Sequence, residues 1–110
     1  MTSHKFLLTY SVSPTETTSD TKKKLADKVR DKIADIEIGD WKKAVNVETT
    51  FAGTIDVTGV TNKEKWESAA KEVKRVMEQA YRDCEATTKD VAVNYAMLLS
   101  NAGEAFSFKQ

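Results

Sequence analysis

Proline, cysteine and histidine each occur once in this 110-residue chain, and glycine occurs four times. So little proline and glycine excludes a low-complexity chain and favours an ordered domain. A single cysteine excludes a disulfide within the chain, and together with one histidine it is too few for a Cys/His zinc site. We therefore expect no metal, no cofactor and a reducing, cytoplasmic compartment.

Net charge and long apolar runs are also missing. The 17 basic and 17 acidic side chains cancel, so no overall field draws the chain to nucleic acid. No stretch approaches the roughly 18 consecutive apolar residues of a membrane-spanning helix, and the apolar run before Pro14 is too short for a signal peptide. We expect no membrane partner, and any site for a polyanion must come from local charge asymmetry.

Two apolar periodicities follow one another in the first third of the chain. Residues 5–12 alternate large apolar side chains on one face, with Leu7 on the other, which predicts a strand mostly buried on both sides and ended by Pro14. After Ser19, a good helix-capping residue, apolar residues recur at helical spacing. This pattern predicts a first helix that ends near Gly39.

Alternation returns over residues 45–57, where one face is apolar and the other polar. Because one strand of that length would be unusual, we predict two strands joined by a turn near Thr49 to Gly53. Further along, Thr61 and Glu64 have the spacing of a capping box. The apolar stripe from Trp66 to Cys84 then predicts a long second helix.

The last quarter of the chain predicts two more strands. Residues 91–95 alternate in a fourth strand, Asn101 to Gly103 form a turn, and residues 105–108 form a short fifth strand. Right-handed crossovers place both helices on one face of such a sheet. The order therefore predicts one α+β domain over residues 1–110, a ferredoxin-like β-α-β-β-α-β unit with an additional C-terminal strand, its antiparallel sheet covered by two helices.

Two segments resemble a known family. They are Phe6 to Pro14, which reads as a first strand ending in a loop, and Ala44 to Ile55, whose Val, Thr, Phe and Gly residues are similar to the opening of a third strand. The family is the small ferredoxin-like CRISPR-associated spacer-acquisition subunit, and virulence-associated protein D relatives share its fold. That family keeps a metal-binding aspartate at the end of the first strand, where this chain has Ser11. The resemblance thus implies a scaffold without the usual hydrolytic centre.

The same resemblance bears on the fifth predicted strand. In that family the extra strand joins the sheet of the neighbouring subunit, which implies a two-fold homodimer with Phe106 and Phe108 at its interface. From the residues alone, a short apolar strand must pair with something, because an exposed edge invites association. The sequence leaves open whether the pairing is within the chain or between chains.

Basic side chains gather on the first predicted helix. The candidate contacts for nucleic acid or an acidic partner are Lys22, Lys23, Lys24, Lys28 and Lys32. Three of them follow i, i+4 spacing and could touch successive phosphates. A neighbouring row of aspartates, Asp27, Asp31 and Asp35, cancels part of that field, so a solvated, salt-bridged face is the alternative.

Four single side chains invite a chemical role that their context does not favour. His4 lies near the terminus and is expected to be exposed, so it is a poor acid or base. Cys84 continues an apolar stripe and is expected to be a small buried residue rather than a nucleophile. Trp41 and Trp66 are expected to close the core rather than stack on bases.

These features favour a non-catalytic binding or scaffold protein, dimeric and in contact with nucleic acid or a larger protein complex, in the prokaryotic or phage defence setting that the resemblance implies. One alternative is a metal-dependent endonuclease in which Glu16, Glu48 or Asp56 replaces the absent aspartate. Another is a small protein-binding inhibitor or regulator that uses an exposed strand edge or the mixed-charge helices.

Overall fold

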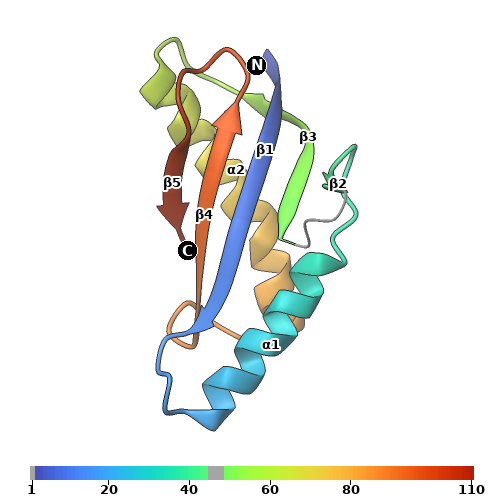
Figure 1. Ribbon diagram of the computed structural model, residues 1–110, viewed down its shortest axis with the longest axis vertical. Helices are drawn as coiled ribbons and strands as arrows, with labels where there is room; N and C mark the ends of the chain where they lie inside the picture. The colour runs from blue at the N-terminus through green and yellow to red at the C-terminus, as the bar shows by residue number, and fades with distance from the viewer. Residues whose placement is uncertain (1, 45–48) are drawn as a thin grey trace.

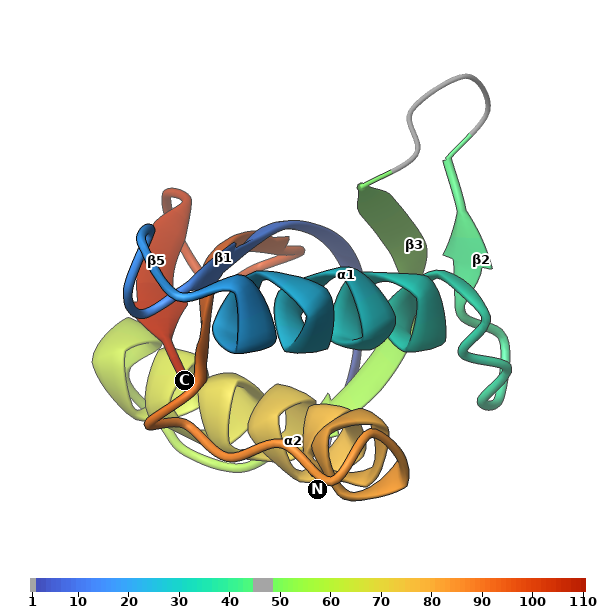
Figure 2. The ribbon, with the colours of Figure 1, turned by 90° about the horizontal axis from the view of Figure 1, so that it is seen from below.

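The computed structural model describes residues 2–44 and 49–110. Its elements are β1 (Thr2–Pro14), α1 (Asp20–Ala34), β2 (Lys42–Lys43), β3 (Thr50–Val57), α2 (Asn62–Asp83), β4 (Val91–Leu99) and β5 (Phe106–Lys109). The strands form one antiparallel sheet in the order β2-β3-β1-β4-β5 (Figure 1). Both helices lie on the same side of it (Figure 2).

The predicted α+β class, two helices over an antiparallel sheet, is confirmed. The arrangement is consistent with a ferredoxin-like fold, and its strand order departs from the plain four-stranded version by the edge strand β5 beside β4. No helix among the described residues is long and apolar enough to cross a membrane.

The central strand, β1, is buried on one face only. Its buried side chains are His4, Phe6, Leu8, Tyr10 and Val12. All the other side chains from Thr2 to Ser13 are exposed. The predicted burial on both sides is therefore wrong, because both helices cover the same face and leave Leu7 47% exposed. The predicted end of the strand at Pro14 is confirmed.

The first helix begins as predicted and ends earlier. Ser19 is its N-cap, and its side chain accepts a hydrogen bond from the Lys22 amide. The predicted end near Gly39 is wrong. The Asp35 amide donates to the Lys32 carbonyl and the Ile36 amide to the Ile33 carbonyl, hydrogen bonds between residues three apart as in a 3₁₀ turn. They tighten the last turn, and the helix ends at Ala34. Apolar spacing continues past that point because Ile36 packs against the core from the loop.

The second helix carries the predicted capping box. The Thr61 hydroxyl accepts from the Glu64 amide at 3.1 Å, and the Glu64 carboxylate accepts from the Thr61 amide at 3.0 Å. Hydrogen bonds that the Thr61 amide and hydroxyl donate to the Glu64 carboxylate hold the pKa of Glu64 below its ordinary value. Cys84 forms the C-cap and is only partly buried against the core, less than expected, because the helix ends one residue before it.

The two strands predicted within residues 45–57 are only partly as expected. The predicted positions of the first of them, residues 45–48, lie outside the described residues, and β2 is a two-residue strand at Lys42–Lys43. Within the range given for the predicted turn, near Thr49 to Gly53, the structure has a turn at Thr49 alone, since β3 starts at Thr50. Gly53 serves a different need: a Cβ there would lie 3.0 Å from the Trp41 Cα, so glycine permits close packing rather than a turn.

The last two strands pair within the chain. β4 is confirmed and extends to Leu99, and β5 pairs antiparallel with it in the register Tyr95 to Phe108 and Met97 to Phe106. Phe106 stacks on Trp66 with ring centroids 5.3 Å apart, and Phe108 stacks on Tyr95 at 4.8 Å. Both aromatic rings proposed for a dimer interface are thus engaged inside their own chain.

Candidate functional site

The predicted lysines divide into two groups along α1. At its start, the Lys22 ammonium binds the Glu16 carboxylate at 3.1 Å, while Lys23 and Lys24 are exposed. Further along, Lys28 and Lys32 face the end of α2. The structure therefore does not present the five lysines as one uniform cationic surface.

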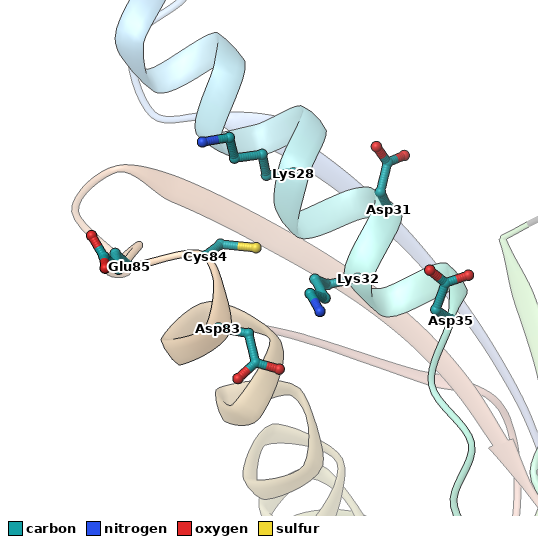
Figure 3. A pocket seen from close by; sticks show the side chains of 7 residues that line it. All are labelled: Lys28, Asp31, Lys32, Asp35, Asp83, Cys84 and Glu85. Atoms are coloured by element: carbon teal, nitrogen blue, oxygen red, sulfur yellow. The ribbon is translucent and has the colours of Figure 1, made fainter.

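A groove of about 500 Å³ separates the second half of α1 from the end of α2. It is lined by Lys28, Asp31, Lys32, Asp35, Asp83, Cys84 and Glu85. Figure 3 shows the Cys84 side chain directed toward α1. This groove brings two of the predicted lysines together with four carboxylates, a combination that no single stretch of sequence reveals.

Charge decides what this groove attracts. Two lysines against four carboxylates leave a net formal charge of minus two, which opposes binding of a phosphate chain. Burial, opposed in part by Lys32, raises the pKa of the Cys84 thiol. The thiol therefore stays protonated near neutral pH and lacks the activation that a nucleophilic cysteine needs.

The described carboxylates considered as a replacement for the missing aspartate, Glu16 and Asp56, lie at opposite ends of β1. Ser11 lies on the exposed face of β1 opposite Asn94, whereas Asp56 pairs with Ser3, eight residues away along the strand. At about 3.3 Å per residue this separation is about 26 Å. Glu16 follows β1 and is bound by Lys22, and Glu48 lies outside the described residues. Within the described chain, no three His, Cys, Asp or Glu side chains are grouped to hold a metal ion.

His4 is buried, so its predicted exposure is wrong. It is only 5% exposed because β1 begins at Thr2, and the alternation of this strand turns His4 toward the helices. Its Nδ1 lies 2.6 Å from the Ser100 carbonyl oxygen, which assigns the proton to Nδ1. Nε2 finds no hydrogen-bond partner among the described residues. The His4 side chain therefore links β1 to the turn after β4 through this hydrogen bond.

The face of the sheet that no helix covers carries the main apolar feature of the surface. Leu7 pairs with Ala52 on β3 and with Leu98 on β4, so the two leucines stand side by side. They are 47% and 44% exposed, and a shallow hollow of about 230 Å³ lies over them. Sequence analysis missed this face because it assigned Leu7 to a second buried side. The one available signal was Leu98, which breaks the buried alternation of β4.

The two tryptophans close the core as predicted. Trp41 is 9% exposed, and its ring lies edge-on to Phe6 with centroids 4.9 Å apart. Trp66 is partly buried and donates from Nε1 to the Ala102 carbonyl at 2.7 Å. Neither indole stands on the uncovered face.

Comparisons with known proteins return no match: no family model, curated protein or solved structure matches the chain. The resemblance to the spacer-acquisition subunit stays a prediction.

Proposed function

We propose that the chain is a binding or scaffold protein that forms a homodimer through the uncovered face of its sheet. The observation that carries this proposal is the pair Leu7 and Leu98, each nearly half exposed at adjacent positions on the central strands. Burying exposed apolar surface against a partner is favourable by about 25 cal/mol per Å². Exposed apolar side chains grouped on one face are typical of an interaction site.

A second copy of the chain is the partner that this patch suits. A dimer with two-fold symmetry places the same patch on both sides of its interface. A two-fold axis in the plane of the sheet face, passing between Leu7 and Leu98, brings the pair against its own counterpart. The apolar pair thus meets its own copy at the centre of the proposed interface.

The available area is sufficient for such a dimer. With strands about 4.8 Å apart and about 3.3 Å per residue, a five-stranded sheet with a nine-residue β4 presents a face of about 20 by 30 Å. Two such faces in contact bury about 1,200 Å², at the lower end of the standard range for stable interfaces. Sheets packed in this way lie about 10 Å apart.

The uncovered face favours a protein partner over single-stranded nucleic acid. Base stacking requires aromatic rings, and Phe106 and Phe108 on β5 are instead stacked against Trp66 and Tyr95. This dimer also differs from the exchanged fifth strand that the family resemblance implies, since β5 keeps its pairing with β4.

Light scattering coupled to size-exclusion chromatography tests the proposal on three proteins. The wild type is expected to be a dimer, and Leu7→Lys is expected to be a monomer because it buries an unpaired charge at the centre of the interface. Val60→Lys is the matched control, since Val60 is an 89% exposed aliphatic residue outside the sheet. It is expected to remain dimeric. A wild type that stays monomeric into the millimolar range, or a Leu7→Lys dimer, would reject the proposal.

A further inference from the structure

The outer edge of β3 is only partly covered. β2 pairs with Phe51 and Ala52 alone, so residues 54–57 have no strand partner on that side within the described chain. A cleft of about 590 Å³ opens beside this edge, between β3, the loop before β2 and α2. Its apolar walls come from Ile38, Trp41, Ile55 and Val76.

On either side of Asp56, side chains form hydrogen bonds with the outward-facing backbone groups of β3 and of the residue that follows it. The Asp40 carboxylate accepts from the Thr54 amide at 2.9 Å, and the Trp41 indole donates to the Thr54 carbonyl at 3.2 Å. Beyond it, the Thr58 amide donates to the Ser68 hydroxyl at 2.9 Å. Of the outward-facing backbone groups at this edge, those of Thr54 and the Thr58 amide are therefore already bonded to side chains.

The backbone of Asp56 points into the open part of this edge. In an antiparallel pair, alternate residues direct their N–H and C=O groups to opposite neighbours. The Thr50 carbonyl accepts from Ala44, on the outer side, so Thr54 and Asp56 in the same phase also face outward. Asp56 therefore offers one donor and one acceptor that no described residue uses.

The charge of the cleft selects the ligand. Asp40, Asp56 and Glu72 line it, and no lysine or arginine does. Glu72 is bound by Arg75 at 2.5 Å, which lowers the pKa of Glu72. Asp40 is held by Thr54, and the Asp56 carboxylate has no ion pair or hydrogen bond among the described residues. The cleft lining thus keeps the carboxylates of Asp40 and Asp56 over an apolar wall, and Lys71, Lys74 and Arg75 lie in the adjoining hollow that Asp56 also lines.

We propose that this cleft binds an extended peptide segment rich in lysine or arginine, which adds to the sheet along Asp56. Main-chain groups of the peptide pair with the Asp56 N–H and C=O, the general mode of strand addition. The aliphatic stem of a lysine or arginine covers the Trp41 and Val76 wall while its charged head reaches Asp56 and Asp40. The partner is thus a protein with a basic, extended segment, and the site is separate from the Leu7 and Leu98 face.

The probe is a fluorescein-labelled octapeptide of alternating valine and lysine, compared with one of alternating valine and glutamate. Fluorescence anisotropy is expected to show binding of the basic peptide alone. Asp56→Lys is expected to weaken it about tenfold, and Asp56→Asn, which keeps the backbone, less strongly. Asp31→Lys is the matched control, with the same charge change on α1 outside the cleft, and is expected to change affinity less than about twofold.

Amide NMR locates the peptide. Binding is expected to shift the Trp41 indole N–H and the amides of residues 54–58, and to slow hydrogen exchange at the Asp56 amide. Equal binding of the acidic peptide, shifts confined to α1 or to the uncovered face, or unchanged affinity in both Asp56 variants would overturn the proposal. Spermidine that competes fully, with no protection of the Asp56 amide, would reduce the site to simple cation binding and overturn strand addition. Repeating the titration with Leu7→Lys keeps this result independent of dimerisation.

Discussion

Neighbouring leucines on the same strands show how differently the two faces of the sheet are used. Leu8 is fully buried and Leu7 is 47% exposed, and on β4 Leu99 is 2% and Leu98 44% exposed. Residue type and strand are the same in each pair, so only the position of the helices separates them. A sheet covered on one face must either expose the apolar residues of the other or bury them in a partner.

Shortening one leucine from each face is expected to give the largest contrast in stability. Leu8→Ala leaves a cavity against the helices and should lower the free energy of unfolding by about 2–5 kcal/mol. Leu7→Ala should cost less than about 1 kcal/mol in the isolated chain, because much of its side chain is already in contact with water. Urea denaturation at low protein concentration measures both.

The same comparison has an internal replicate. Leu99→Ala and Leu98→Ala on β4 should repeat the large and small losses. At high protein concentration, the difference in stability loss between the buried-leucine and exposed-leucine variants should become smaller. A dimer stabilises the wild type by mass action, and the exposed leucines then contribute to stability through the interface. Equal losses for Leu7 and Leu8 would mean that the second face is covered within the chain.

Periodicity and capping predicted most of the elements, because those signals are local. The capping box at Thr61, the apolar stripe of α2 and the alternation of β4 follow from residues within a few positions of each other. The predictions were wrong where contacts between distant parts of the chain determine burial or strand formation. His4 is drawn into the sheet by pairing with β3, and two lysines at β2 carry no strand signal of their own.

The candidate sites were less accessible to sequence analysis than the fold. The cleft beside β3 joins Ile38 in a loop, Ile55 on a strand and Val76 on a helix, residues that only the folded chain brings together. The groove of Figure 3 likewise joins α1 to the end of α2. The sequence indicates Asp56 only as a possible metal ligand, whereas its place at a free edge depends on how short β2 is.

A second, smaller contrast between the faces is expected at Gly53 and Ala52. The Gly53 position faces the helices, where an added Cβ would meet the Trp41 Cα at 3.0 Å and the Asp40 carbonyl at 3.2 Å. Trp41 cannot easily move, since its ring contacts Phe6 and its indole binds Thr54. Gly53→Ala should therefore cost about 1–3 kcal/mol.

Ala52→Val adds more volume one residue away and serves as the control. Ala52 lies on the uncovered face opposite Leu7, so the change should stay within about 0.5 kcal/mol. Thermal unfolding of both variants decides the matter. Tolerance of alanine at Gly53 would show that the Trp41 segment shifts freely, and would weaken the proposed wall of the cleft.

The Asp40 carboxylate at the outer edge of β3 should make the stability of the fold depend on pH. Hydrogen bonds from the Thr54 amide and hydroxyl lower the pKa of Asp40. A carboxyl group with a lowered folded-state pKa stabilises the fold above its unfolded pKa, about 4, and this contribution is lost as the pH falls through the folded value. Asp40→Asn should therefore reduce the Tm modestly at pH 7, and the gap to wild type should close below about pH 4.

Asp31→Asn is the control for this measurement, because its carboxylate has no hydrogen bond among the described residues. Its Tm should follow that of the wild type across the range. A gap between wild type and Asp40→Asn that persists unchanged at pH 2 would mean that amide geometry rather than charge sets the effect.

The smallest effect is expected on α1, outside both faces, where the lysines bear on polyanion binding. Lys23 and Lys24 are exposed near the start of the helix, whereas Lys28 and Lys32 lie among four carboxylates. If α1 contacts nucleic acid, reversing the first pair to glutamate should lower heparin or single-stranded DNA affinity more than reversing the second, although the charge change is the same. The slope of log K against log salt should fall by about 1.5 for the first pair. Stability should change by less than about 0.5 kcal/mol in both. Equal losses would mean that the acidic groove does not screen its lysines, and no loss in either variant would remove nucleic acid from the partners of α1.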